Sequence, residues 1–168
     1  MRAPKTIQDV QEHFLFPSAL FADQAPYRVQ TILGSCVAVC LYDTRLGWGG
    51  VNHYMMPWWN GEGIPSPKYG DVSMELLLKK MESFGSYRAD LVAKVFGGAN
   101  QHFTNTNLLD IGERNIKTAI SFLENQRIPI VGQSVGGTQG RKIVFFTGTG
   151  QVYMKLLNHI EIKNNGND

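Results

Sequence analysis

A cysteine and a histidine carried by two neighbouring strand-like segments are the residues of this sequence best suited to do chemistry. Cys36 follows Gly34 and Ser35, and His53 lies in the next apolar segment along the chain. An imidazole beside a thiol can accept its proton, lower the pKa of the thiol and hold a thiolate that attacks a carbonyl carbon. Backbone N–H groups at the Gly34–Ser35 turn can then face the developing oxyanion.

The spacing of this pair fits a β-hairpin. If residues 43–46 form its loop, Cys36 lies directly opposite His53 on one face, with the Cβ atoms about 4.5–5.5 Å apart. A third group usually orients the histidine, and Thr31 and Asn52 are the local candidates. A register shifted by one residue would separate the pair, so a buried structural cysteine and a structural histidine remain the alternative.

The two cysteines do not suit a metal site or a disulfide. Cys36 and Cys40 lie on one face of the expected strand, about 13 Å apart at about 3.3 Å per residue. That distance is too large for two ligands of one zinc ion and for a disulfide bond. We therefore expect no metal and no other cofactor, and we expect Cys40 to lie in the core.

Short strands and two main helices must position the pair. An amphipathic stripe after Asp71, which we expect to cap the helix, predicts the first helix, and apolar residues within 116–123 predict the second. Because several strands precede the first helix, the order favours a single α/β domain with a mixed or antiparallel sheet over a doubly wound parallel one. The expected strands lie near residues 27–33, 37–42, 48–56, 91–96, 128–134, 142–147 and 151–156.

Composition sets the broad class. The chain has 168 residues, of which 43% are hydrophobic, and a formal net charge of +2, so it can bury a core and lacks the charge of a broad phosphate-binding face. No apolar run approaches the roughly 20 residues of a membrane span, and residues 1–10 lack the apolar region of a secretory signal. We expect a cytoplasmic protein that binds no nucleic acid and inserts into no membrane.

The chain divides into three parts on this interpretation. We expect residues 1–26 to form an irregular lead-in that packs on the body, 27–160 to form the domain, and 161–168 to form a frayed polar tail. A lid, a docking arm and a plain packing segment are all compatible with the lead-in.

Several separate motifs resemble, in order, those of the CheD family of chemoreceptor glutamine deamidases. They extend from about residue 27 to 153 and include TILGSCVAVCLYD (31–43), GGVNH (49–53), KYGD (68–71), KVFGGAN (94–100), IGERN (111–115), VGG (135–137), GRK (140–142) and TG (149–150). This set is far more specific than a cysteine–histidine pair alone.

The resemblance implies a sandwich similar to the catalytic domain of cytotoxic necrotizing factor toxins, with a Cys–His–Thr triad. Cys36 matches the nucleophile, His53 matches the base, and Thr31 is the threonine on the strand before the Gly-Ser-Cys turn. It also implies hydrolysis of glutamine side chains to glutamate, with release of ammonia, on methyl-accepting chemoreceptors gathered in receptor arrays. Some relatives also hydrolyse receptor methyl esters. Many pair with CheC, a phosphatase of the response regulator CheY, and that binding competes with receptor binding.

A glutamine side chain on a receptor helix needs a shallow cleft with walls that carry little bulk. Glycines suit such walls, although turns that need a positive φ explain them equally well. We also expect the loop 57–69 to border the cleft with Trp58 and Trp59. The candidate wall residues are Asn52, Gly49, Gly50, Gly97 and Gly98.

Two other functions remain open from the sequence. In the first, the fold is a binding module that docks receptors or a CheC-like phosphatase, with catalysis secondary or lost. In the second, it is another thiol enzyme, such as a transglutaminase-like acyl transferase or a protease. Replacement of Cys36 by alanine would leave a binding module functional but inactivate an enzyme. Among thiol enzymes, a transferase would consume an added amine, and a protease would cut a backbone bond.

Overall fold

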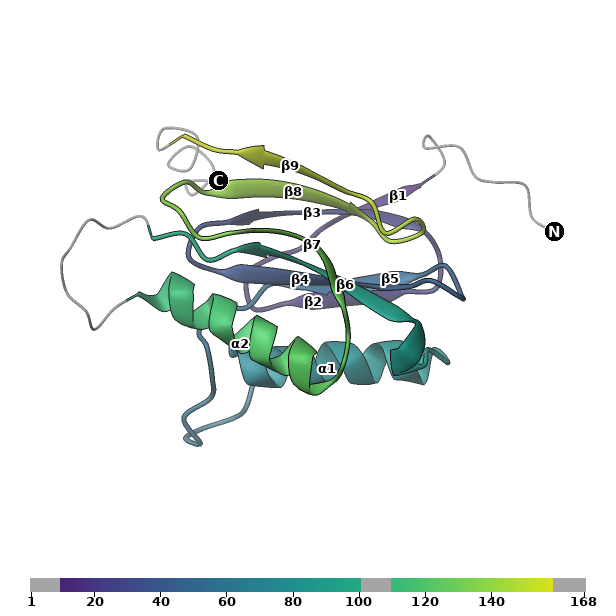
Figure 1. Cartoon of the computed structure of the whole chain (residues 1–168), viewed down its shortest axis with the longest axis horizontal. Coiled ribbons are helices and arrows are strands. Elements are labelled where there is room, and N and C mark those ends of the chain that lie inside the picture. Colours follow the sequence, from purple (N-terminus) through teal and green to yellow (C-terminus); the bar gives the residue numbers. More distant parts are fainter. Residues whose placement is uncertain (1–9, 101–109, 159–168) are drawn as a thin grey trace.

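Three layers form the fold: two β-sheets stacked face to face, and two helices on the outer face of one of them (Figure 1). The computed structural model describes residues 10–100 and 110–158. The first sheet has the strand order β1-β3-β8-β9, and the second has the order β2-β5-β4-β6-β7. Both sheets pair strands in parallel as well as antiparallel, which confirms the expected mixed α/β architecture.

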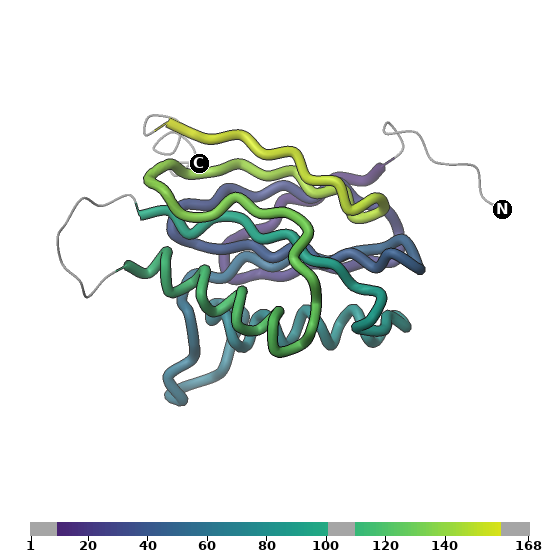
Figure 2. Tube along the Cα trace, viewed as in Figure 1, coloured from purple at the N-terminus to yellow at the C-terminus, as the bar shows by residue number. Residues whose placement is uncertain are grey.

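The first four strands alternate between the two sheets, β5 to β7 stay in the second sheet, and β8 and β9 complete the first; Figure 2 shows the path of the chain. Helix α1 follows β5, and helix α2 follows β6. The strands are β1 (Gln11–Phe14), β2 (Leu20–Asp23), β3 (Tyr27–Leu33), β4 (Val37–Asp43), β5 (Gly49–Asn52), β6 (Leu91–Gly97), β7 (Ile130–Val135), β8 (Arg141–Phe146) and β9 (Val152–Leu156), and the helices are α1 (Gly70–Ser83), α2 (Ile111–Asn125) and a short 3₁₀ turn at Arg88–Asp90.

Strand β4 is the central element, because both of its faces are buried. Val37, Val39 and Leu41 belong to the core between the second sheet and the helices. Ala38 and Cys40 belong to the core between the two sheets. Burial on both faces explains the almost unbroken apolar run of this strand. Cys36 packs against the inter-sheet core, on the same side as Ala38.

The two helices begin in different ways. Asp110 caps α2, because its side chain accepts a hydrogen bond from the N–H of Glu113 at 3.0 Å. Asp71, the cap expected for α1, lies inside that helix, whose N-cap Tyr69 makes no side-chain capping bond. The Asp71 carboxylate instead accepts a hydrogen bond from the N–H of Trp59 at 3.0 Å and so holds the preceding loop.

The N-terminal segment is more regular than expected. Strand β1 pairs in parallel with β3, and β2 pairs antiparallel with β5, so the segment joins the two sheets. Leu15 between these strands is fully buried. Residues 11–14 and 20–23 are thus strands rather than part of an irregular segment, whereas packing of the whole lead-in on the body stays a prediction. The predicted frayed tail, 161–168, lies outside the described residues, and the expected domain boundaries stay predictions.

The loop that joins β5 to α1 projects past the helical layer, away from the sheets (Figure 1). The Trp59 indole N–H donates to the carbonyl of Glu62 inside this loop, and Trp58 is exposed. The structure therefore gives no support to the prediction that Trp58 and Trp59 border a cleft at Cys36. In the part of the chain that the structure describes, no helix is long and apolar enough to cross a membrane.

Candidate active site

The turn that carries Cys36 crosses from β3 in the first sheet to β4 in the second. Two backbone hydrogen bonds fix it from the side of β6: the N–H of Gly98 donates to the carbonyl of Cys36 at 2.9 Å, and that of Ala99 to the carbonyl of Gly34 at 3.0 Å. Gly97 has a φ of +106°, and a Cβ atom there would lie 2.2 Å from the Cys36 carbonyl oxygen. Gly97 and Gly98 therefore support the cysteine turn by close backbone approach.

His53 lies just after β5 and contacts Thr31 of β3, so the contact bridges the two sheets. The Thr31 hydroxyl oxygen and His53 Nδ1 are 2.7 Å apart, and both residues are buried. The same hydroxyl donates its single proton to the carbonyl of Leu15 at 2.7 Å. It therefore accepts at its other contact, so Nδ1 carries the imidazole proton. His53 Nε2 is left with its lone pair, the form that a general base needs.

The hairpin between β4 and β5 has a different register from the predicted one. Val37 bridges Tyr54 and Cys40 pairs with Val51, which places His53 opposite Ala38 rather than opposite Cys36. Cys36 and His53 are then diagonal neighbours on one face. Diagonal positions lie about 7–8 Å apart. His53 Nε2 is buried and has no hydrogen-bond partner among the described residues, so Cys36 and His53 make no direct hydrogen bond in this structure.

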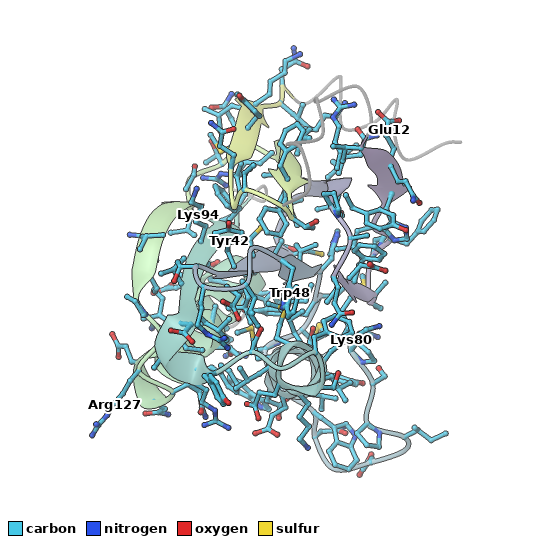
Figure 3. The ribbon with its side chains drawn as sticks, turned by 90° about the vertical axis from the view of Figure 1, so that its right-hand side faces the viewer. Glu12, Tyr42, Trp48, Lys80, Lys94 and Arg127 are labelled. Carbon is cyan, nitrogen blue, oxygen red and sulfur yellow. The ribbon has the colours of Figure 1, made fainter. Side chains whose placement is uncertain are left out.

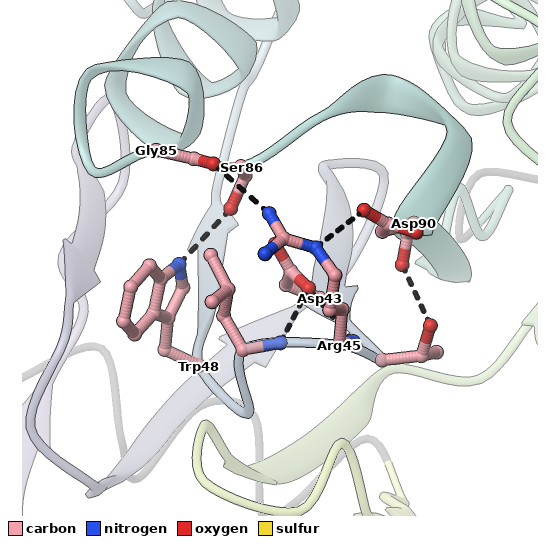
Figure 4. A network of polar contacts seen from close by, with 8 residues as sticks. Asp43, Arg45, Trp48, Gly85, Ser86 and Asp90 are labelled. Atoms are coloured by element: carbon pink, nitrogen blue, oxygen red, sulfur yellow. Dashed lines mark hydrogen bonds and ion pairs between the residues drawn. The ribbon is translucent and has the colours of Figure 1, made fainter.

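A longer loop explains the register. Pairing ends at Tyr42 and Gly49, and the N–H of Asp43 donates to the carbonyl of Trp48 at 2.8 Å. The Asp43 carboxylate accepts from the N–H groups of Arg45 at 2.9 Å and Leu46 at 2.8 Å, which folds the loop (Figure 4). The loop is therefore longer by an even number of residues than expected, which keeps Cys36 and His53 on one face.

Burial shifts both titrating groups toward their neutral forms. It lowers the pKa of His53 to about 4 and raises the pKa of the Cys36 thiol to about 11. The expected lowering of the thiol pKa is therefore wrong for the free protein. At neutral pH the pair consists of a thiol and a neutral imidazole, so the thiolate forms only as the imidazole accepts its proton.

The other candidate wall residues lie away from Cys36. Asn52 is fully buried; its carboxamide accepts from the N–H of Val39 at 2.7 Å and donates to Met74 Sδ at 3.2 Å. Gly49 and Gly50 pair with the far end of β4, where a Cβ atom on Gly50 would lie 2.7 Å from that of Ala22. Close packing in the core thus accounts for these two glycines.

Asn115 of α2 makes hydrogen bonds at the site, although in the sequence it stands out only as the last residue of the IGERN motif (111–115). Its side-chain Nδ2 donates to the carbonyl of Ser35 at 2.9 Å and to that of Met55 at 3.0 Å. The residue is fully buried. Its long separation along the chain from both partners explains why local spacing gave no signal for it.

A small cavity of about 170 Å³ lies elsewhere and is lined by Cys40, Tyr42 and Lys94 among others. Figure 3 labels Tyr42 and Lys94, which come from adjacent strands. Lys94 Nζ donates to the carbonyl of Gly150 at 2.9 Å. The cavity includes neither Cys36 nor His53. Among residues 10–100 and 110–158, no three His, Cys, Asp or Glu side chains gather to hold a metal ion, and both cysteines are free thiols.

Comparison with known proteins gives consistent matches. The family model described as CheD chemotactic sensory transduction matches residues 55–156. The chain is 50% identical over 145 residues to the probable chemoreceptor glutamine deamidase CheD of Trichlorobacter lovleyi, which covers 86% of this chain and 90% of that protein. The corresponding protein of Sulfurimonas denitrificans is 44% identical over 154 residues, 91% of this chain and 99% of the relative. That of Rhodospirillum rubrum is 38% identical over 151 residues, 90% and 85% of the two chains.

Proposed function

The chain belongs to the CheD family, and we propose that it hydrolyses glutamine side chains of chemoreceptors to glutamate, with Cys36 as nucleophile and His53 as base. The observation that carries this proposal is the Thr31–His53 contact, which fixes the proton on Nδ1 and leaves Nε2 unprotonated, buried and without a hydrogen-bond partner among the described residues. Relatives whose names state this activity cover most of the chain.

The reaction begins with proton transfer from the Cys36 thiol to His53 Nε2 as sulfur attacks the carbon of the glutamine carboxamide. The tetrahedral intermediate collapses when the C–N bond breaks and the imidazolium returns the proton, so ammonia leaves. Water then attacks the thioester, gives a proton to the imidazole, and releases glutamate and the free thiol. We assign stabilisation of the oxyanion to backbone N–H groups of the Gly34–Ser35–Cys36 turn.

The pKa values suit this sequence of steps. With its pKa lowered to about 4, His53 is an unprotonated base at neutral pH. The half-buried thiol, with its pKa raised to about 11, stays protonated until a substrate is in place. The enzyme thus holds no permanent thiolate, which would react with electrophiles and oxidants.

The family resemblance extends the proposal to partners and place. We assign methyl-accepting chemoreceptors, in receptor arrays, as the substrate proteins and a CheC-like phosphatase as a competing partner. We also propose that the sandwich shares the fold of the cytotoxic necrotizing factor catalytic domain. A cysteine-bearing turn that crosses between two sheets, with a histidine diagonal to it on the adjacent segment, supports this assignment.

The test measures ammonia release and the intact mass of a purified receptor cytoplasmic domain incubated with wild type, Cys36→Ala or Cys40→Ala. Wild type and Cys40→Ala are expected to convert amide to acid, at sites found by peptide mapping, whereas Cys36→Ala loses several orders of magnitude in rate. No conversion by reduced wild type on several receptors would contradict the proposal and favour a binding module. Cleavage of the backbone, or consumption of an added amine, would indicate a protease or a transferase.

A further inference from the structure

We propose that Asn115 is a positioning residue that fixes the distance between the nucleophile and the base. The proposal rests on the function assigned above to Cys36 and His53. Asn115 is fully buried and touches no solvent, so it acts through the backbone of its neighbours rather than on a substrate.

The two hydrogen bonds of the Asn115 carboxamide reach both halves of the site. One goes to the carbonyl of Ser35, directly before the nucleophile, and the other to the carbonyl of Met55, two residues after the base. One NH₂ group thus holds the cysteine turn and the histidine segment at a fixed separation. A displacement of about 1 Å in such a pair can cost about 10²-fold in rate.

The chemistry of the neighbours decides the orientation of this amide. Both contacts are carbonyl oxygens, which only the NH₂ side can bond. Oδ1 must therefore point the other way, where it is buried and finds no hydrogen-bond partner among the described residues. A buried acceptor without a partner is unfavourable. The structure nevertheless keeps both donor bonds at the cost of an unpaired Oδ1, which indicates that the two donor bonds matter to the fold of the site.

We call the two hydrogen bonds from Asn115 to Ser35 and Met55 the Asn115 clamp. The surrounding backbone makes this clamp rigid. The Tyr54 hydroxyl donates to the backbone carbonyl of Asn115, which adds a third bond to the histidine segment. One turn earlier, Gly112 packs against the β6 end, where an added Cβ atom would lie 2.4 Å from the Gly98 carbonyl oxygen. Gly98 in turn bonds the carbonyl of Cys36. The first turns of α2 therefore hold the cysteine turn by two routes.

The two cysteines give a readout that is independent of deamidation. Cys36 is half-buried, whereas Cys40 is buried, so we expect Cys40 to react with iodoacetamide only when the fold opens. If Asn115 holds the turn in place, Asn115→Ala frees Cys36 toward solvent, and its raised pKa falls toward the ordinary value. At pH 8 alkylation of Cys36 should rise at least about tenfold, because the thiolate fraction rises, while Cys40 stays protected.

The experiment compares wild type with Asn115→Ala, Asn115→Asp, which keeps the side-chain volume, and Leu123→Ala, which weakens the buried face of α2 two turns later. Alkylation of each cysteine is followed by peptide mass, and receptor deamidation is measured in parallel. In both Asn115 variants we expect faster alkylation of Cys36 and a fall of about 10²-fold in kcat with little change in KM. Leu123→Ala should lower stability and raise the alkylation rates of Cys36 and Cys40 to a similar degree, rather than that of Cys36 alone.

Equal acceleration of both cysteines, or an unchanged Cys36 rate in both Asn115 variants, would overturn the clamp. So would a fall in deamidation by Leu123→Ala equal to that by Asn115→Ala. If wild type deamidates no receptor, the proposed function fails, but the alkylation comparison still decides whether Asn115 holds the turn. Should Asn115→Ala not fold, Asn115→Asp and Asn115→Ser provide the same comparison.

Discussion

At the Thr31–His53 contact, one proton decides which imidazole nitrogen can act as a base. The Thr31 hydroxyl donates to Leu15 and accepts from Nδ1, so Nε2 keeps its lone pair. Thr31→Val keeps the shape but removes both bonds, and leaves the Nδ1–H and the Leu15 carbonyl unsatisfied. We expect deamidation to fall about 10²-fold or more and stability to fall by about 1–3 kcal/mol.

Thr31→Ser is the matched control for that change, because it restores the hydroxyl and loses only a methyl group. It should recover most of the activity when both variants are assayed on the same receptor domain. Equal activity of Thr31→Val and wild type would show that the orientation of His53 does not depend on Thr31.

The Cys36 thiol is protonated in the free protein at neutral pH. Since burial raises its pKa to about 11, alkylation of Cys36 in wild type should keep increasing above pH 9. The rate constant with iodoacetamide, followed by peptide mass from pH 6 to 10.5, measures this profile. A plateau reached below pH 8 would instead indicate a preformed thiolate–imidazolium pair.

The turn at the end of β6 supports the cysteine turn through Gly97, which has no free space around its Cα atom. Gly97 and Gly85 have nearly the same φ, +106° and +104°, but a Cβ atom meets the Cys36 carbonyl at Gly97 and nothing within 4 Å at Gly85. Gly85→Ala should therefore cost only the backbone strain, about 1–3 kcal/mol, with activity unchanged. Gly97→Ala should cost more and also displace Cys36, the proposed nucleophile.

Urea unfolding of the two variants, with receptor deamidation measured on the folded fraction, separates strain from displacement. Loss of stability in both variants with loss of activity only in Gly97→Ala is the expected result. If Gly97→Ala is as stable and as active as Gly85→Ala, the contact with Cys36 has no role.

How far the sequence predicts these elements depends on how local their causes are. The apolar run of β4 and the stripe of α1 report burial directly, and both were predicted. The hairpin register was not, because the Asp43 side chain, rather than strand patterning, sets the loop length. Strand β1 escaped prediction because most of its residues are exposed and show no apolar alternation.

The site itself was partly predictable for the same reason. Cys36, His53 and Thr31 were named from a short stretch of sequence and a family resemblance, and the structure brings Thr31 and His53 into contact. The contribution of Asn115 arises from packing between α2 and two distant turns. No local pattern encodes such a contact.

For the whole molecule, the site lies where the two sheets and α2 meet, so the ionisation of its residues is linked to global stability. The pKa of His53 falls from 6.5 to about 4 on folding, which means that the unfolded chain binds the proton more tightly. His53 therefore contributes stability above pH 6.5 that is lost as the pH falls toward 4, at most about 3 kcal/mol.

The two thiols change the free energy of unfolding with pH in the opposite direction to His53. Folding raises the pKa of Cys36 to about 11 and also raises that of Cys40, so their contribution is complete below pH 9 and is lost as the pH rises further. We expect the free energy of unfolding to decrease on both sides of the neutral range. Urea unfolding from pH 4 to 10.5 of wild type, His53→Gln and Cys40→Ala measures both limbs.

His53→Gln should flatten the acid limb, and Cys40→Ala should make the alkaline limb shallower while Cys36 still contributes to it, each without changing the opposite limb. Such independence follows from the positions of the groups, since His53 lies at the Thr31 contact and Cys40 within the inter-sheet core beside Lys94. An acid limb that keeps its slope in His53→Gln would mean that the buried imidazole gains its proton without cost to the fold. The neutral base required for proton transfer from Cys36 would then lose its physical basis.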